Sequence, residues 1–315
     1  MAVIDPVVVL ATTVAAGTPV LYATLGEILT ERSGVLNLGL EGMMLGGGLA
    51  GFAATAATGN LLVGVLAALA AGAGMGLVHA FFSITIGVNQ VVSGLALTLA
   101  GTGLVAFLGR PLVGQAAKAS FKRLEVPLLA DIPVLGPILF RQDALIYLSF
   151  LLVPAFFFFI YRTRPGLNLR SVGESPATAD AQGLSVTGLR YLYTMVGGAL
   201  VGLGGAYVSL AYSPSWQENI TSGRGWIAVG LVIFALWNPW RALLGAYLFG
   251  GMEAFQFSLQ AAGVPISSFF LRMTPYLLTI AALVFTQWRI QSKGSRTSSA
   301  APAGLGLLYL RRERN

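Results

Sequence analysis

The sequence predicts an all-α, polytopic integral membrane protein, and three observations lead to this fold class. Hydrophobic residues make up 56% of the 315 residues, whereas charged residues make up only 10%, which is too apolar for an ordinary soluble domain. Apolar runs of about 20 residues, the length a helix needs to cross the hydrocarbon core, recur along nearly the whole chain. The 40 glycines suit helices that pack closely within lipid.

Read in order along the chain, the apolar runs predict nine transmembrane helices, with eight to ten as the range. The first run is 23 residues long and lacks a basic leading region, so we expect a true span rather than a cleavable signal peptide. The seventh is short and ends at Asn238-Pro239, which together with the glycine-rich segments predicts discontinuous helices. The expected spans are 7–29, 34–57, 61–82, 91–109, 144–161, 190–212, 225–237, 241–260 and 272–288.

Basic residues predict the orientation, because they accumulate on the cytoplasmic side of membrane proteins. The loop 162–189 and the tail 289–315 are both basic, so we expect both inside and the N-terminus outside. The transmembrane domain then covers 1–288, with 110–143 as an extracytoplasmic segment and the tail as a basic, disordered cytoplasmic end. The segment 110–143 runs against this assignment, since its five basic residues are only partly offset by Glu125, Asp131 and Asp143.

Asn37 and Glu41 form the first polar constellation, at the start of the second expected span. Their spacing of four predicts that an amide and a carboxylate project from one helical face at membrane depth. Ionisable groups at that depth are expensive and face a cavity or a partner. Two interpretations remain open: both residues line a pathway, or Glu41 is a buried anchor bonded to neighbouring amides.

A second polar stripe lies on the eighth expected span, where spacings of three and four align Glu253, Gln256 and Gln260. A smaller polar set begins the fourth span and consists of Asn89, Gln90 and Ser93. Either set could line a pathway for a polar ring compound or form a hydrogen-bonded seam between helices. His79 is expected to be a packing residue, and the tryptophans of the stretch 226–240 are expected to be interfacial anchors.

The polar loop 162–183 predicts a short helix between two spans. Ser175 can cap this helix, Pro176 suits its first position, and Gly183 can end it. A short capped helix on the basic side could dock a soluble partner, or it could be a helical turn in a solvated loop.

Several function classes are excluded or disfavoured by what the sequence lacks. No phosphate-binding loop of the form G-x-x-x-x-G-K-[ST] occurs, and the absence of cysteine excludes thiolate metal sites. We expect no catalytic residues, no metal ligands and no cofactor. The net charge of +7 lies in loops and tail rather than in a groove that could bind nucleic acid.

Three strings carry a resemblance: SGVLNLGLEGMM from Ser33, SVGESPATAD from Ser171, and GRGWIA from Gly223 with the later Trp237-Asn-Pro. Over about residues 7–288 the chain resembles the nucleoside-type permease subunits of ATP-binding-cassette (ABC) importers, in the superfamily of ribose and branched-chain amino acid permeases. The resemblance implies half of a nucleoside pathway in the cell inner membrane, with purine nucleosides as the typical substrates.

The same resemblance implies three partners: a second homologous permease, a cytoplasmic ABC ATPase that hydrolyses ATP, and an extracytoplasmic substrate-binding protein. The pathway residues would come from Asn37, Glu41, Asn89, Gln90, Ser93, Glu253, Gln256 and Gln260. Coupling to the ATPase would fall to Glu174, Ser175, Pro176, Ala177, Ala179, Asp180 and Gly183. A permease for simple sugars such as ribose, or a self-sufficient secondary transporter using Glu41, Glu253 and His79, remains an alternative.

Overall fold

The computed structural model of the chain describes residues 5–264, 267, 270–271, 273–274, 276–278, 280–281, 284, 288 and 301–309. Over these residues the protein is mostly helical, which confirms the all-α polytopic class. In the described part, strands are limited to the antiparallel pair β1 (Arg123–Glu125) and β2 (Arg141–Asp143). Of the expected ninth span, 272–288, eight residues lie outside the described part, and the nine described ones are helical.

Ten α-helices and four short π or 3-10 segments follow one another along this part of the chain. The α-helices are α1 (Pro6–Arg32), α2 (Leu40–Thr58), α3 (Leu61–Ala80), α4 (Gln90–Gly109), α5 (Ala144–Arg162), α6 (Arg164–Glu174), α7 (Pro176–Ala181), α8 (Val186–Tyr207), α9 (Arg224–Ala235) and α10 (Pro239–Ala261). The π segments are η1 (Phe81–Ile86), η3 (Gly136–Phe140) and η4 (Val208–Tyr212), and η2 (Arg110–Leu112) is a 3-10 turn.

Short polar side chains determine where several helices begin. Asn60 and Asp143 accept hydrogen bonds from free backbone N–H groups in the first turns of α3 and α5. Asn238 does the same for α10, whose first residue, Pro239, has no N–H to satisfy. These caps place the helix starts close to where the sequence predicts them.

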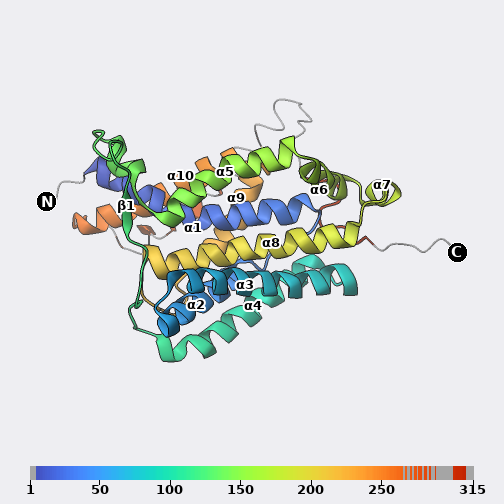
Figure 1. Ribbon diagram of the computed structural model, residues 1–315, viewed down its shortest axis with the longest axis horizontal. Helices are drawn as coiled ribbons and strands as arrows, with labels where there is room; N and C mark the ends of the chain where they lie inside the picture. The colour runs from blue at the N-terminus through green and yellow to red at the C-terminus, as the bar shows by residue number, and fades with distance from the viewer. Residues whose placement is uncertain are drawn as a thin grey trace.

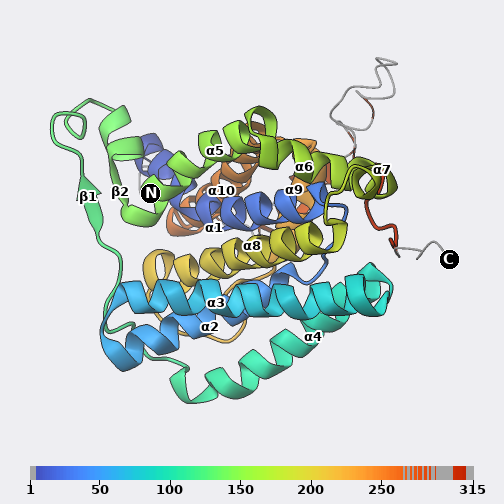
Figure 2. The ribbon, with the colours of Figure 1, turned by 45° about the vertical axis from the view of Figure 1, so that its right-hand side comes forward.

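The long helices run side by side, and the connecting elements gather at two opposite ends (Figure 1). One end carries α6 and α7 and is called the α7 end below; the other carries β1 and β2 and is called the β1 end. Helix α8 lies between α1 on one side and α2 and α3 on the other, with α4 outermost (Figure 2). Helix α10 packs along α1.

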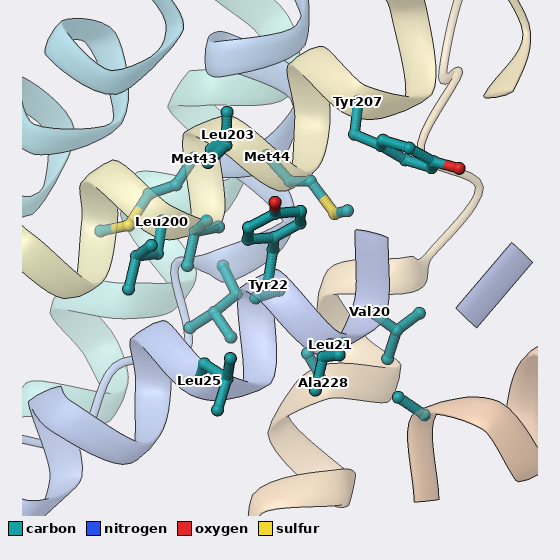
Figure 3. Packing of buried hydrophobic residues seen from close by; sticks show 14 of the residues in the cluster. Val20, Leu21, Tyr22, Leu25, Met43, Met44, Leu200, Leu203, Tyr207 and Ala228 are labelled. Atoms are coloured by element: carbon teal, nitrogen blue, oxygen red, sulfur yellow. The ribbon is translucent and has the colours of Figure 1, made fainter. Parts of the chain in front are cut away.

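The core lies where α1, α2 and α8 meet, and it contains Tyr22, Leu25, Met43, Met44 and Tyr207 (Figure 3). Glycines let these helices approach almost to backbone contact. A Cβ atom at Gly47 would lie 2.2 Å from the Cα of Gly202, and one at Gly205 would lie 1.8 Å from the carbonyl oxygen of Met44. This close packing is how helices associate in a solvent that provides no hydrophobic drive between them.

Five helical stretches of the described part are long and apolar enough to cross a bilayer: Pro6–Arg32, Leu61–Ile86, Gln90–Leu112, Ala144–Arg162 and Val186–Tyr212. Helix α9 is shorter, as predicted from Asn238-Pro239. The expected second span differs at its start: helix α2 begins only at Leu40, and the chain before it is not helical.

Two expectations made from the sequence are wrong at particular residues: the interfacial anchor at Trp237 and the disordered tail over residues 301–309. Trp237 is buried and donates a 2.6 Å hydrogen bond from Nε1 to Glu31 Oε2, so it anchors the turn to α1 rather than to a lipid interface. The tail is not disordered over residues 301–309, because Pro302 is buried and the N–H of Gly304 donates to the carbonyl oxygen of Gly173 at 2.8 Å. The reason is that Pro302 and Gly304 pack closely against Gly173, near the end of α6.

Candidate functional site

A cavity of about 860 Å³ lies among α2, α4, α9, α10, η4 and the loop 213–223 that follows η4. The loop belongs to the β1 end, because Ser215 pairs with Ala116 and the N–H of Gly114 donates to the carbonyl oxygen of Trp216. The cavity therefore lies toward the β1 end of the bundle. Its lining combines charged groups, amides and hydroxyls with the aromatic rings of Tyr212, Trp226, Phe249, Phe257 and Tyr276.

Glu41 projects from the first turn of α2 toward the start of α9. Its carboxylate accepts hydrogen bonds from Thr221 Oγ1 at 2.5 Å, from the N–H of Gly223 at 2.9 Å and from the N–H of Gly225 at 2.7 Å. The two backbone donors belong to a helix N-terminus, where a negative charge is stabilised. The side chain is 5% exposed and borders the cavity, so Glu41 joins α2 to α9 as an anchor at the cavity wall.

The close approach of α2 and α9 depends on Gly225. A Cβ atom at this position would lie 2.5 Å from both the Cα and the backbone nitrogen of Glu41. Only a glycine at position 225 therefore allows the Glu41 carboxylate to reach the N-terminus of α9.

The expected shared helical face of Asn37 and Glu41 is wrong, because Asn37 lies in a non-helical stretch before α2. This unwound segment, residues 33–39, begins with a turn and continues without helical hydrogen bonds. Asn37 Oδ1 accepts from the N–H of Gly39 at 2.8 Å, and its own N–H donates to Glu27 Oε1 at 3.0 Å. The spacing of four between Asn37 and Glu41 does not predict a shared face here, because the glycines at 34 and 39 favour an unwound chain over a continuous helix.

Polar side chains from α3 and α4 complete the hydrogen bonding of the unwound segment. Gln90 Oε1 accepts from the N–H of Leu36 at 2.7 Å, and His79 Nε2 lies 3.0 Å from the carbonyl oxygen of Leu36. Ser93 Oγ lies 3.0 Å from His79 Nδ1. Backbone groups at membrane depth need such partners, because lipid offers none.

The polar set of Asn89, Gln90 and Ser93 does not line the cavity; Gln90 and Ser93 support the unwound segment instead. Gln90 and Ser93 are absent from the lining, and Asn89 caps α4 by accepting from the N–H groups of Val91 and Val92. Asn37 is also absent from the lining. The seam interpretation therefore fits the set better than a pathway-lining one.

The stripe on α10 divides in the same manner. Glu253 and Gln256 line the cavity. Gln260 does not line it and is exposed in the last turn of α10. The third residue of the stripe falls outside because it lies one turn beyond the cavity, near the end of the helix.

An ion pair between α9 and α10 closes one side of the cavity. Arg224 Nη2 contacts Glu253 Oε1, and Tyr212 OH donates to the same oxygen at 3.2 Å. The guanidinium carbon lies 5.3 Å from the centre of the Tyr212 ring, within cation–π range. Arg224 Nη1 also donates to the carbonyl oxygen of Thr221 at 3.2 Å.

Sequence reasoning found Glu253 but missed Arg224 and Tyr212. A usable signal existed, because Arg224 is a cation at the start of an apolar helix and such residues mark sites or partners. Its partner on α10 follows only from the packing of the two helices.

We expect Arg224→Met to destabilise the protein, because it leaves the Glu253 carboxylate without its cation. Breaking a buried pair on one side costs about 3–5 kcal/mol, whereas replacing both partners by apolar residues is often neutral. Thermal unfolding should therefore show a lower midpoint for Arg224→Met and recovery in the double variant with Glu253→Met. If Arg224→Met and wild type had the same midpoint of thermal unfolding, the ion pair between Arg224 and Glu253 would not stabilise the protein.

At the opposite end of the bundle, α6 and α7 form the short helical element predicted between two spans. Pro176 begins α7 after Ser175, whose hydroxyl lies 2.7 Å from Thr178 Oγ1 instead of bonding a backbone N–H. Gly183 ends the turn in the left-handed region at φ +82°. Glu174 is exposed, and Asp180 is half-buried.

Ala179, one of the residues expected to couple to the ATPase, does not belong to the exposed face of this element. Its side chain is buried against Val172 and Val186, where α7 folds back on α6 and α8. The exposed side of α7 carries Ala177, Thr178 and Ala181. Small residues are thus available for close docking at Ala177, which the expected set contains, and at Ala181.

Comparison with known proteins matches the chain to one family model and to relatives that are named as permeases. Residues 9–286 match the family described as branched-chain amino acid transport system / permease component. The chain is 44% identical over 302 residues to the putative glucose ABC transporter permease protein of Haloferax volcanii, covering 89% of this chain and 92% of the relative. It is 34% identical to the guanosine ABC transporter permease protein of Bacillus subtilis, covering 94% of each chain. It is 32% identical to the nucleoside ABC transporter permease protein of Lactococcus lactis, covering 84% of this chain and 88% of the relative.

Proposed function

Because the chain belongs to the branched-chain amino acid transport system permease family, we propose that it forms half of a translocation pathway for nucleosides, typically purine nucleosides. Members of this family are multi-pass ABC transporter subunits and are not enzymes. Permeases of this family work with an ATPase and a substrate-binding protein. A second homologous permease would supply the other half of the pathway in the cell inner membrane. The α7 end would face the cytoplasm, and the β1 end with the N-terminus would face outside.

The lining of the cavity is the observation that carries this proposal. Its aromatic rings offer flat faces to a base, and stacking of a base on an aromatic side chain contributes about 1–3 kcal/mol. Gln217, Asn219 and Gln256 add amide groups that can pair with both donors and acceptors on a base edge. We therefore assign the pathway lining to Glu41, Glu253 and Gln256 of the residues predicted from the sequence.

The substrate test is uptake into vesicles that contain this chain with its co-encoded subunits. We expect ATP-dependent uptake of labelled guanosine that excess adenosine reduces and excess glucose or ribose does not. Glucose is the second candidate, since the relative from Haloferax volcanii is named for it. Uptake of glucose but not guanosine would replace the nucleoside assignment, and guanosine uptake driven by an ion gradient without ATP would indicate a secondary transporter.

A simple prediction concerns the energy source. The purified chain alone should neither bind nor hydrolyse ATP, because it lacks a phosphate-binding loop. Binding of a fluorescent ATP analogue and phosphate release are the measurements. Hydrolysis that copurifies stoichiometrically with the isolated chain would contradict the assignment as a permease.

Coupling to the ATPase is proposed for α7 and its flanks, where Glu174 and Asp180 would fix the register of docking. We expect Ala177→Trp to weaken copurification of the ATPase and to abolish uptake, because Ala177 is exposed on α7. Ala179→Trp is the comparison: it should lower the folded amount of permease, because Ala179 is buried. Normal ATPase copurification and uptake with Ala177→Trp would show that α7 is only a connector.

A further inference from the structure

Residues 302–309, which we call the C-terminal strap, lie across the α7 end and bond to two segments far away in the sequence: the end of α6 and the turn after α1. The N–H of Ala303 donates to Glu174 Oε2 at 3.2 Å, and the N–H of Gly304 donates to the carbonyl oxygen of Gly173 at 2.8 Å. The N–H of Gly306 donates to the carbonyl oxygen of Gly34 at 3.2 Å. The strap thus joins the end of α6 to the start of the unwound segment.

Packing fixes the strap at both of its ends. A Cβ atom at Gly304 would lie 2.7 Å from the carbonyl oxygen of Gly173 and 3.2 Å from Cδ of Pro176, the first residue of α7. Tyr309 packs on the cluster formed by Val172, Ala179 and Val186. The strap therefore contacts α7 and the helices that hold it.

Arg190 ties the strap to the unwound segment a second time. Its side chain is 2% exposed, and Nε donates to the carbonyl oxygen of Ser33 at 3.1 Å while Nη1 donates to that of Leu307 at 3.3 Å. Charge-assisted bonds of this kind are about twice as strong as neutral ones. One buried guanidinium from α8 therefore holds both segments together.

We propose that the C-terminal strap is a positioning element for transport, which transmits movement of α7 to the unwound segment and so to Glu41. A continuous chain of contacts supports this: α7 and Gly173 contact the strap, the strap contacts Gly34, and residues 34–39 lead directly into the first turn of α2. Glu41 in that turn holds the start of α9 at the cavity wall. The proposal rests on the proposed docking of the ATPase at α7.

The first test unseats the strap by a substitution in the strap itself, with every residue of α7 and of the cavity kept. Gly304→Val should push the strap away from Gly173, and Ala301→Val is the control because Ala301 is exposed. With Gly304→Val we expect the ATPase to copurify normally, while substrate molecules transported per ATP hydrolysed fall roughly 2- to 30-fold, the range of energetic coupling between linked sites. An unchanged ratio would overturn the proposal.

The second test fixes the strap in place and does not depend on which substrate is transported. The chain contains no cysteine, so Glu174→Cys with Ala303→Cys introduces its only two thiols. Trypsin should release peptides 171–190 and 297–311, and after oxidation mass spectrometry should find them joined. Failure to join would show that the strap does not lie on α6.

The oxidised double variant also shows whether transport requires the strap to stay in place or to detach. The reduced form of the same variant is the reference, because Glu174→Cys already removes a residue of the proposed docking element. Relative to that form, we expect oxidation itself to leave ATP hydrolysis and transport per ATP unchanged. Loss of coupling on oxidation would overturn the proposal, because it would mean that the strap has to leave its position. If wild type fails to take up nucleosides, the nucleoside assignment fails, but the peptide test of the strap still stands.

Discussion

Glu41→Ala is expected to reduce uptake to below about one tenth of the wild-type rate at equal protein abundance. The change removes the acceptor for three hydrogen bonds, two of them from the N-terminus of α9. Each charged hydrogen bond contributes about 1.5–3 kcal/mol, and 1.4 kcal/mol corresponds to a factor of ten in an equilibrium. The start of α9 and the cavity wall should therefore lose their defined position.

Two further variants make the result for Glu41 specific. Glu41→Gln keeps the shape but turns one acceptor into a donor facing other donors, so we expect uptake between wild type and Glu41→Ala. Glu218→Ala removes a carboxylate from the same cavity, but Glu218 is exposed, so its effect should be small. Normal uptake by Glu41→Ala, measured in membranes with matched protein amounts, would rule out both the anchor and the pathway role.

Gly47→Val is expected to give the largest loss of folded protein. A Cβ atom at Gly47 would lie 2.2 Å from Cα and 2.4 Å from the carbonyl oxygen of Gly202, so α2 and α8 would have to separate. Inserting atoms into a packed core costs about 1–3 kcal/mol when side chains can adjust, and here the obstacle is backbone. The thermal stability of the detergent-solubilised protein, followed by size-exclusion chromatography, measures the effect.

Gly103→Val is the matched control for this prediction. Gly103 also lies inside a long helix, α4, but a Cβ atom there would meet nothing within 4 Å. We expect its stability to remain close to wild type. Equal stability of the Gly47 and Gly103 variants would mean that α2 and α8 do not meet at this crossing.

The sequence predicts most helices because their determinants are local. Lipid requires long apolar stretches, and capping residues such as Asn89, Asp143 and Asn238 act on backbone groups two or three residues away. The end of α9 before Asn238-Pro239 follows from the same local chemistry. The short helix from Pro176 is also read directly from its sequence.

What the sequence does not predict depends on partners distant along the chain. The unwound segment is stable because Gln90 and His79 satisfy Leu36, and neither partner is evident from residues 33–39 themselves. The pairing of Arg224 with Glu253 requires α9 and α10 to lie together. Ala179 faces inward because α7 folds back on α6, and no helical pattern in six residues specifies that.

The interior position of α2 also has a consequence for how the protein is made. Its glycines, its buried Glu41 and the unwound residues before it leave α2 outside the group of helices that are apolar enough to cross a bilayer alone. A carboxylate within a membrane-spanning segment opposes insertion. The flanking α1 and α3 are strongly apolar, so α2 should leave the translocon together with them, as one cooperative unit of three helices rather than as a separate insertion step.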